Sequence, residues 1–238
     1  MASTELERGF VLHRRDYGDT SLLLEVLSAA EGRLPLIAKG ARRASRGRTA
    51  AAALLQPFQP LWLAWSGRGE VRTLTRVEAA GRALALSGDA LYCGLYVNEL
   101  LVRLLGRQDP HEALFVFYQQ VLSELASGRG IDGALRRFEL RLLGELGWAP
   151  DLARDADGEP IDPARHYVYS PERGLLPAVA VQTTTVAGGT LRRLAAELPL
   201  EGAQAREARD LLRAILAPHL GERPLKSREL FVRATRRP

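Results

Sequence analysis

Cysteine is almost absent from this chain. Cys93 is the single cysteine among 238 residues, so no disulfide can form within the chain and no cysteine cluster can bind zinc. Long apolar segments are also missing, because no run approaches the ~18–20 residues that cross a membrane. The first ten residues contain acidic side chains and lack the apolar stretch of a secretory signal. These absences predict a cytoplasmic protein with no membrane partner.

Sequence motifs of the common enzyme classes are missing as well. There is no glycine-rich loop followed by lysine, no serine elbow of the G-x-S-x-G type and no dinucleotide-binding fingerprint. The four histidines are scattered, without a second ligand at metal-binding spacing. We therefore predict no catalytic site, no cofactor and no metal, and an enzyme is the remotest of the functions considered.

Lysine is scarce, and the basic charge is uneven along the chain. Lys39 and Lys226 are the only lysines among 33 basic residues. Residues 1–80 carry 12 basic and 8 acidic side chains, and residues 191–238 carry 11 and 6. The residues between these two ends are near neutral or acidic. Two basic ends predict a polyanionic partner. The alternative is that a GC-rich genome favours arginine over lysine, which would explain the composition without any such partner.

Short apolar runs separated by turn residues occupy the first eighty residues. Leu61, Leu63 and Trp65 alternate with other residues at the period of a strand. Five strands in so short a segment leave exposed edges unless the sheet closes. We therefore predict a small OB-fold barrel, with an SH3-like barrel as the alternative. The expected strands lie at about 9–15, 21–27, 34–39, 58–65 and 70–77.

The rest of the chain has the spacing of amphipathic helices. One helix is expected over 87–105, a second from Asp109, whose carboxylate would cap the first turn, and a third from Asp132 to Gly147. These three predict a helical bundle. A β-hairpin is expected within 166–181, and further helices at 190–198, at 204–220 and from Ser227.

The predicted fold class is therefore α+β. An OB-fold β-barrel for nucleic-acid binding would occupy residues 1–80. A mainly α-helical domain would occupy residues 81–238, with a small β-hairpin insertion at about 148–190.

No acidic residue occurs between Gly32 and Gly69. Without a carboxylate to neutralise them, the cations of this stretch predict a DNA-binding strand and loop, like the groove of sequence-tolerant single-strand binders. If six cations contacted single-strand phosphates, the salt slope would be about −4. A solvated surface loop is the alternative. The predicted contacts are Arg33, Lys39, Arg42, Arg43, Arg46 and Arg48, with Arg14 and Arg72 on neighbouring strands.

Three aromatic residues near this stretch could stack on bases, although core positions would explain them equally. Trp62 and Trp65 have opposite parity along one strand, so at most one of them faces the core. Tyr17, in an expected turn, is the freer of the three.

Eight short segments carry a family resemblance. They are GFVL (9–12), DTSL (19–22), AKGAR (38–42), LQPF (55–58), GRGEV (67–71), YVNELL (96–101), LRRFEL (135–140) and PLKSRELF (224–231). Over essentially the whole chain, this set resembles the RecO family of bacterial recombination mediators. The resemblance implies an OB-fold followed by a mainly helical domain. It also implies binding of single- and double-stranded DNA and annealing of complementary strands, and therefore a place at the nucleoid.

The resemblance further implies protein partners. These are RecR, RecA as a functional partner, and the acidic C-terminal tail of the single-strand-binding protein, SSB. Many relatives carry a four-cysteine zinc site after an ELG[YW] segment. Here residues 145–148 match that segment but no cysteine follows, so zinc is not expected.

An acidic tail ending in an aromatic residue needs an apolar groove with a cation at its rim. Arg136 is the favoured anchor. The full set of tail-binding candidates is Leu135, Arg136, Arg137, Arg103 and Arg107. Lys226 and Arg228 are candidates for extending the DNA path onto the second domain, and a solvated tail would explain them equally.

Two other functions fit the same residues. An RNA-binding OB-fold protein of RNA metabolism would use the same basic loop, because phosphate contacts carry no sugar or base information. An assembly adaptor that does not bind DNA would work through the helical domain alone. Comparing DNA with RNA tests the first reading. Changing Arg42, Arg43 and Arg46 together to alanine and measuring annealing tests the second.

Overall fold

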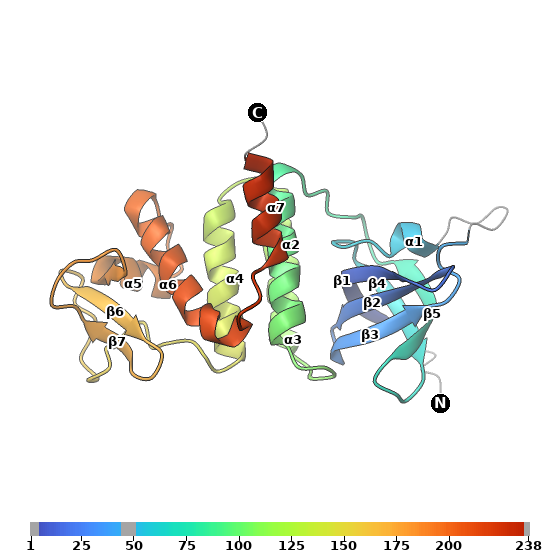
Figure 1. Ribbon diagram of the computed structural model, residues 1–238, viewed down its shortest axis with the longest axis horizontal. Helices are drawn as coiled ribbons and strands as arrows, with labels where there is room; N and C mark the ends of the chain where they lie inside the picture. Colours follow the sequence, from blue (N-terminus) through green and yellow to red (C-terminus); the bar gives the residue numbers. More distant parts are fainter. Residues whose placement is uncertain (1–4, 44–50, 236–238) are drawn as a thin grey trace. The chain divides into compact units, whose positions relative to one another are not determined.

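The structure, a computed structural model, describes residues 5–43 and 51–235 (Figure 1). The chain divides into two compact units. One unit comprises residues 1–128 together with 224–238, and the other comprises residues 129–223. Within the described ranges, no helix combines the length and apolar character needed to cross a bilayer.

Five strands of the first unit close into a barrel, drawn in blue to cyan in Figure 1. The order around the barrel is β1-β2-β3-β5-β4, in which β3 and β5 are parallel and the other pairs are antiparallel. This is the topology of an OB-fold and not of an SH3-like barrel, so the predicted fold class is confirmed. The strands are β1 (Glu7–Tyr17), β2 (Ser21–Ser28), β3 (Gly32–Ala38), β4 (Leu61–Ser66) and β5 (Arg72–Ala79), and the short helix α1 (Ala51–Leu54) lies between β3 and β4 in the chain.

Alternating side chains of β2 show how the core of the barrel is built. Leu22, Leu24 and Val26 of β2 point inward and are buried against the other strands. On β4, Trp65 is 3% exposed and belongs to the core, whereas Trp62 is 37% exposed. The opposite parity of the two tryptophans, predicted from the sequence, is confirmed.

A bulge in β1 joins the barrel to the helices of the first unit. Val11 pairs with Val26 and His13 with Glu25, which leaves Leu12 as the extra residue. The side-chain amide of Asn98, on α2 (Gly88–Leu104), donates a hydrogen bond of 2.9 Å to the free Leu12 carbonyl. The barrel therefore holds the helix through a backbone group that the β-ladder cannot satisfy.

Two further helices complete the first unit. α3 (Glu112–Ala126) packs against α2, and its Tyr118 ring meets the Phe10 ring edge-on, with 5.1 Å between centroids. α3 begins at Glu112 with His111 as its N-cap, so the expected start at Asp109 is wrong. α7 (Lys226–Thr235) packs against α2, where Glu99 accepts hydrogen bonds from the first turn of α7.

The second unit combines three helices with a small sheet. Its helices are α4 (Ile131–Glu145), α5 (Gly188–Ala195) and α6 (Gly202–Leu220), and its strands are β6 (His166–Ser170), β7 (Gly174–Pro177) and β8 (Thr185–Ala187). β6 and β7 form the predicted hairpin, and β8 adds a third, unpredicted strand on the other side of β6. α4 packs against α6 in this unit. Of the three consecutive helices predicted to form a bundle, α2 and α3 belong to the first unit and α4 to the second.

Candidate nucleic-acid interface

Side chains alternate between the two faces of each strand, so every second residue of β1, β2 and β3 points away from the barrel core. Together these residues form the outer face of the three strands. Because Leu22 and Leu24 point inward, Leu23 points outward. The ladder pairs Arg15 with Leu23, Leu23 with Ile37, and Ile37 with Thr73. These four residues form one row across four strands, with exposed Arg15 at its β1 end and two half-buried aliphatic side chains in its centre.

One end of this face is rich in cations. Tyr17 is the last residue of β1, pairs with Ser21 across the β1–β2 turn and is 52% exposed. Ala38 pairs with Leu22, so the alternation places the next residue, Lys39, outward beside Ser21. We name this end, together with the segment after β3 that contacts the β1–β2 turn, the cationic corner and define it as Arg15, Tyr17, Lys39, Arg42 and Arg43, all of which are exposed.

The segment after β3 is held against the β1–β2 turn by its backbone. The Arg42 amide donates to the Thr20 carbonyl at 3.0 Å, and buried Ala41 accepts a hydrogen bond from the Ala52 amide at 3.0 Å. The Arg42 guanidinium lies 3.2 Å from the Asp16 carboxylate. Within the described parts of the chain, no carboxylate forms an ion pair with Arg15, Lys39 or Arg43. These three charges are therefore available to a polyanion.

The opposite end of the outer face is ion-paired. The Arg33 guanidinium lies 3.1 Å from Glu25, and Arg107 approaches the same carboxylate at 3.5 Å. Burial, together with the charge of Arg107, holds the pKa of Arg33 below its ordinary value despite Glu25. The sequence argument that no carboxylate neutralises these cations is therefore wrong for Arg33, and also for Arg42, which pairs with Asp16. Glu25 and Asp16 precede the acid-free stretch in the chain but reach it through the fold.

Two further candidates also make contacts within the barrel region. Arg72 is bonded to Glu31 at 2.5 Å and to the Gln108 side chain at 3.2 Å. Arg14 donates to the carbonyls of Ala52 and Leu55, at 3.0 and 3.4 Å. Both guanidinium groups hold chain segments together, which leaves fewer donors for a phosphate.

The remaining candidates for DNA contact lie apart from this corner or outside the description. Arg46 and Arg48 lie outside the described residues. Lys226 and Arg228 are exposed on α7, where Arg228 stands 5.9 Å from the centre of the Tyr96 ring. Arg15 was missed in the sequence prediction. The predicted strand ended at residue 15 and left Tyr17 in a turn, whereas β1 continues to Tyr17 and so places both residues on one face.

The five residues predicted to bind an acidic tail belong to both units, Arg103 and Arg107 to the first and the other three to the second. Leu135 and Arg136 lie on α4 and are buried, and Arg136 forms a 2.8 Å ion pair with Glu139 while being 7% exposed. Arg137, on the same helix, is half-buried. Arg107 is engaged by Glu25 and Glu70. The fold therefore buries Arg136, although a carboxylate anchor has to be accessible.

Arg103 occupies a different environment in the first unit. It lies on α2 at the rim of a largely apolar groove between β1, α2 and α7, and it donates to the Pro224 carbonyl at 3.4 Å. Lys226 and His13 supply further basic groups to this groove, and Glu99 supplies an acidic one. The apolar part of the lining comprises Leu12, Leu95, Val102 and Leu230.

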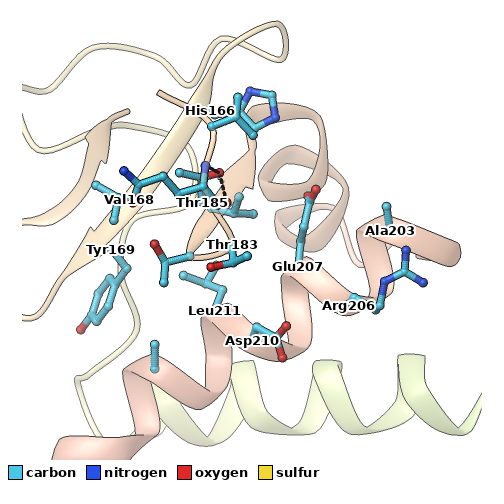
Figure 2. Close-up of a pocket in the computed structure, with 15 residues that line it drawn as sticks. His166, Val168, Tyr169, Thr183, Thr185, Ala203, Arg206, Glu207, Asp210 and Leu211 are labelled. Atoms are coloured by element: carbon cyan, nitrogen blue, oxygen red, sulfur yellow. Dashed lines mark hydrogen bonds between the residues drawn. The ribbon is translucent and has the colours of Figure 1, made fainter. Parts of the chain in front are cut away.

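A second cavity lies in the other unit, between the three-stranded sheet and α6 (Figure 2). Its charged groups come from α6. Glu207 is engaged by the Ala187 amide and the Thr190 hydroxyl, and Asp210 is bonded to Arg209. In the described parts of the chain, no group of three or more histidine, cysteine or acidic residues is arranged to hold a metal ion.

The closed barrel and its exposed cationic corner, followed by helices and a small sheet, define an OB-fold protein with a mainly helical second part. Comparison with known families agrees with this description. The profile described as recombination protein O N terminal matches residues 1–82, and that described as recombination protein O C terminal matches residues 85–229. The chain belongs to the recombination protein O family, and its role lies in DNA repair and recombination.

Curated relatives cover nearly the whole chain, and those described here are named DNA repair protein RecO. The relative from Methylococcus capsulatus is 48% identical over 228 residues, which are 95% of this chain and 92% of the relative. The one from Ralstonia nicotianae is 44% identical over 94% of this chain and 82% of its own length. The one from Actinobacillus succinogenes is 44% identical over 97% of both chains.

Proposed function

We propose that this chain is a non-enzymatic recombination mediator that binds single- and double-stranded DNA and anneals complementary strands. Together with RecR, it would help RecA to load onto DNA coated by SSB. Such a protein acts in the cytoplasm, at the nucleoid. The cationic corner is the observation that carries the proposal, because it offers exposed charge on the face that OB-folds use for nucleic acids.

The composition of the corner suits contact with the sugar-phosphate backbone. Arg15, Lys39, Arg42 and Arg43 supply four charges, so the expected salt slope for a single strand is about −3, not the −4 expected from six cations. Contacts of this kind position a strand and leave its base edges unread. A strand held by its backbone can therefore still pair with its complement, which is what annealing requires.

The geometry favours a different anchor for the SSB tail from the one predicted. Arg136 would have to leave Glu139 and its buried position before it could meet a carboxylate. Arg103 and Lys226 instead line an apolar groove, which is the combination that an acidic peptide with an aromatic end requires. Arg103 lies 3.9 Å from Glu99, a longer ion pair than the 2.8 Å of Arg136 and Glu139. The proposed tail site is therefore this groove, with Arg103 as the anchor. A tail-peptide titration with Arg103→Ala and Arg136→Ala tests it, and an unchanged affinity for Arg103→Ala would reject it.

An annealing assay tests the proposed function itself. Lys39, Arg42 and Arg43 are changed together to alanine, and the annealing of complementary DNA strands is followed by energy transfer between end labels. The matched control changes three exposed arginines of the second unit, Arg165, Arg173 and Arg192, and so removes the same charge. We expect the first variant to lose most of its annealing and the control to retain it.

The same assay separates the two other functions. Normal annealing by the corner variant would favour an adaptor that does not bind DNA through the barrel. Binding of a matched RNA strand more tightly than DNA, with wild-type protein, would favour a role in RNA metabolism.

A further inference from the structure

Tyr17 is an exposed aromatic ring at the point where the cations gather. It ends β1 and faces outward, next to Ser21 and the position of Lys39. A ring that is 52% exposed contributes little to the barrel core. Aromatic rings beside a basic track are stacking platforms for unpaired bases. A duplex, whose bases are stacked on one another, has no unpaired base to place on this ring.

Asp16, the residue before Tyr17 in the chain, already forms an ion pair with Arg42. The two side chains are 39% and 69% exposed, for Arg42 and Asp16, and lie 3.2 Å apart. An ion pair in such exposed surroundings is weak and is screened by salt. A phosphate group carries the same charge as this carboxylate and can take its place at the guanidinium. Asp16 therefore competes internally with any phosphate for Arg42.

We propose that the cationic corner selects single strands over duplexes: an unstacked base lies on Tyr17 while a neighbouring phosphate replaces Asp16 at Arg42. The inference rests on the proposed function, because it assumes that this corner is where DNA binds. A flexible single strand can supply the base and the phosphate together. A duplex can supply only the phosphate, and so it meets the competition from Asp16 without the compensating stacking contact.

The first arm of the test concerns the ring. Tyr17→Leu keeps an apolar side chain but removes the π face, and Tyr17→Phe keeps that face. Affinities are measured by fluorescence anisotropy for an unstructured single strand and for a duplex of equal length. We expect Tyr17→Leu to weaken single-strand binding by roughly fivefold or more, the low end of one stacked base. Duplex binding should change by less than about twofold, and Tyr17→Phe should behave as wild type.

A matched aromatic control exists on the same barrel. Trp62 is partly exposed and stands beside Arg8, 5.8 Å from its guanidinium carbon, near the start of β1, whereas Tyr17 ends that strand. Trp62→Leu is expected to leave the ratio of single-strand to duplex affinity unchanged. A change in that ratio as large as that of Tyr17→Leu would overturn the proposal.

The second arm concerns the competing carboxylate. Asp16→Asn should strengthen DNA binding by about two- to tenfold at low salt and make the salt slope steeper by up to about 0.7 for a single strand. The gain should vanish when Arg42→Gln is added. Unchanged affinity in Asp16→Asn would overturn the competition. Equal weakening of both DNA forms in Tyr17→Leu, or no weakening, would overturn strand selection. If wild-type protein bound no DNA at all, the proposed function itself would fail, which is a distinguishable result.

Discussion

The guanidinium of Arg33 lies 3.1 Å from the carboxylate of Glu25, across the β2–β3 hairpin. The two side chains are largely shielded from solvent, and Arg107 approaches the same carboxylate. Arg33 is one of the six cations from which a DNA-binding face was predicted, and its charge is instead used in an ion pair within the barrel. Lys39, which directly follows the same strand β3, is exposed. Two cations of one short stretch therefore have different roles.

This division predicts different phenotypes for two single substitutions. Arg33→Met leaves Glu25 partly shielded with one cation fewer, so the free energy of unfolding should fall by about 1–3 kcal/mol. Lys39→Met removes an exposed charge and should change stability by no more than about 0.5 kcal/mol, while weakening DNA binding. Urea unfolding and anisotropy measure the two quantities. Equal stability of the two variants would contradict the assignment.

The sequence predicted the barrel well because its strands are separated by turn residues and alternate in polarity. It could not reveal which arginines are neutralised, because the partner of Arg33 lies eight residues earlier in the chain and becomes a neighbour only through the hairpin. The three-residue strand β8 was missed because so short a segment carries no period. The grouping of α4 with α6 depends on packing between distant segments, which helical periodicity does not encode.

Asn98 and Tyr118 form a buried polar connection between the helices and the β1 bulge. The Tyr118 hydroxyl donates to the Asn98 side-chain oxygen at 2.8 Å, and the Asn98 amide donates to Leu12. Asn98→Leu would leave the Leu12 carbonyl and the Tyr118 hydroxyl without partners, so the free energy of unfolding should fall by about 2–4 kcal/mol. Tyr118→Phe should cost about 1–2 kcal/mol.

A double-mutant cycle checks that the two residues act together. Asn98→Leu should lower the free energy of unfolding by less in a Tyr118→Phe background than in wild type. The reason is that the Tyr118 hydroxyl, one of the two groups that lose their partner, is already absent. Strictly additive losses, measured by urea unfolding, would show that the hydrogen bond contributes nothing.

Glu99 couples the C-terminal helix to α2 in a pH-dependent manner. Burial opposes its ionisation, but hydrogen bonds from Ser227 and Lys226 prevail and hold the pKa of Glu99 below its ordinary value of 4.5. A lowered carboxyl pKa stabilises the folded state above the ordinary pKa, and this contribution is lost as the pH falls through the folded-state value. Glu99→Gln should therefore be less stable than wild type at pH 7, with the difference shrinking in acid below 4.5.

Unfolding measured across the pH range would check this dependence. Glu222→Gln removes an exposed carboxylate four residues before α7 in the sequence and is the control. A difference between wild type and Glu99→Gln that stayed constant from neutral to acid pH would refute the role of the ionised carboxylate.

Gly188 marks a close backbone approach in the second unit. A Cβ at this position would lie 2.0 Å from the Asp162 carbonyl oxygen, whereas a Cβ at Gly189 would find its nearest neighbour, the Pro163 oxygen, at 3.7 Å. Gly188→Ala should therefore destabilise the protein by several kcal/mol, as strongly overpacked sites do. Gly189→Ala should be nearly neutral. Thermal unfolding of both variants decides this, and similar melting temperatures would contradict the predicted contact.

The salt dependence of single-strand binding tests the central claim most directly. Log affinity is plotted against log salt for wild type, for the triple alanine variant at Lys39, Arg42 and Arg43, and for the control triple at Arg165, Arg173 and Arg192. Loss of three phosphate contacts should make the slope shallower by about 2 in the corner variant, with no change in the control. Identical slopes for the corner variant and wild type would contradict the assignment of this corner as the DNA-binding face.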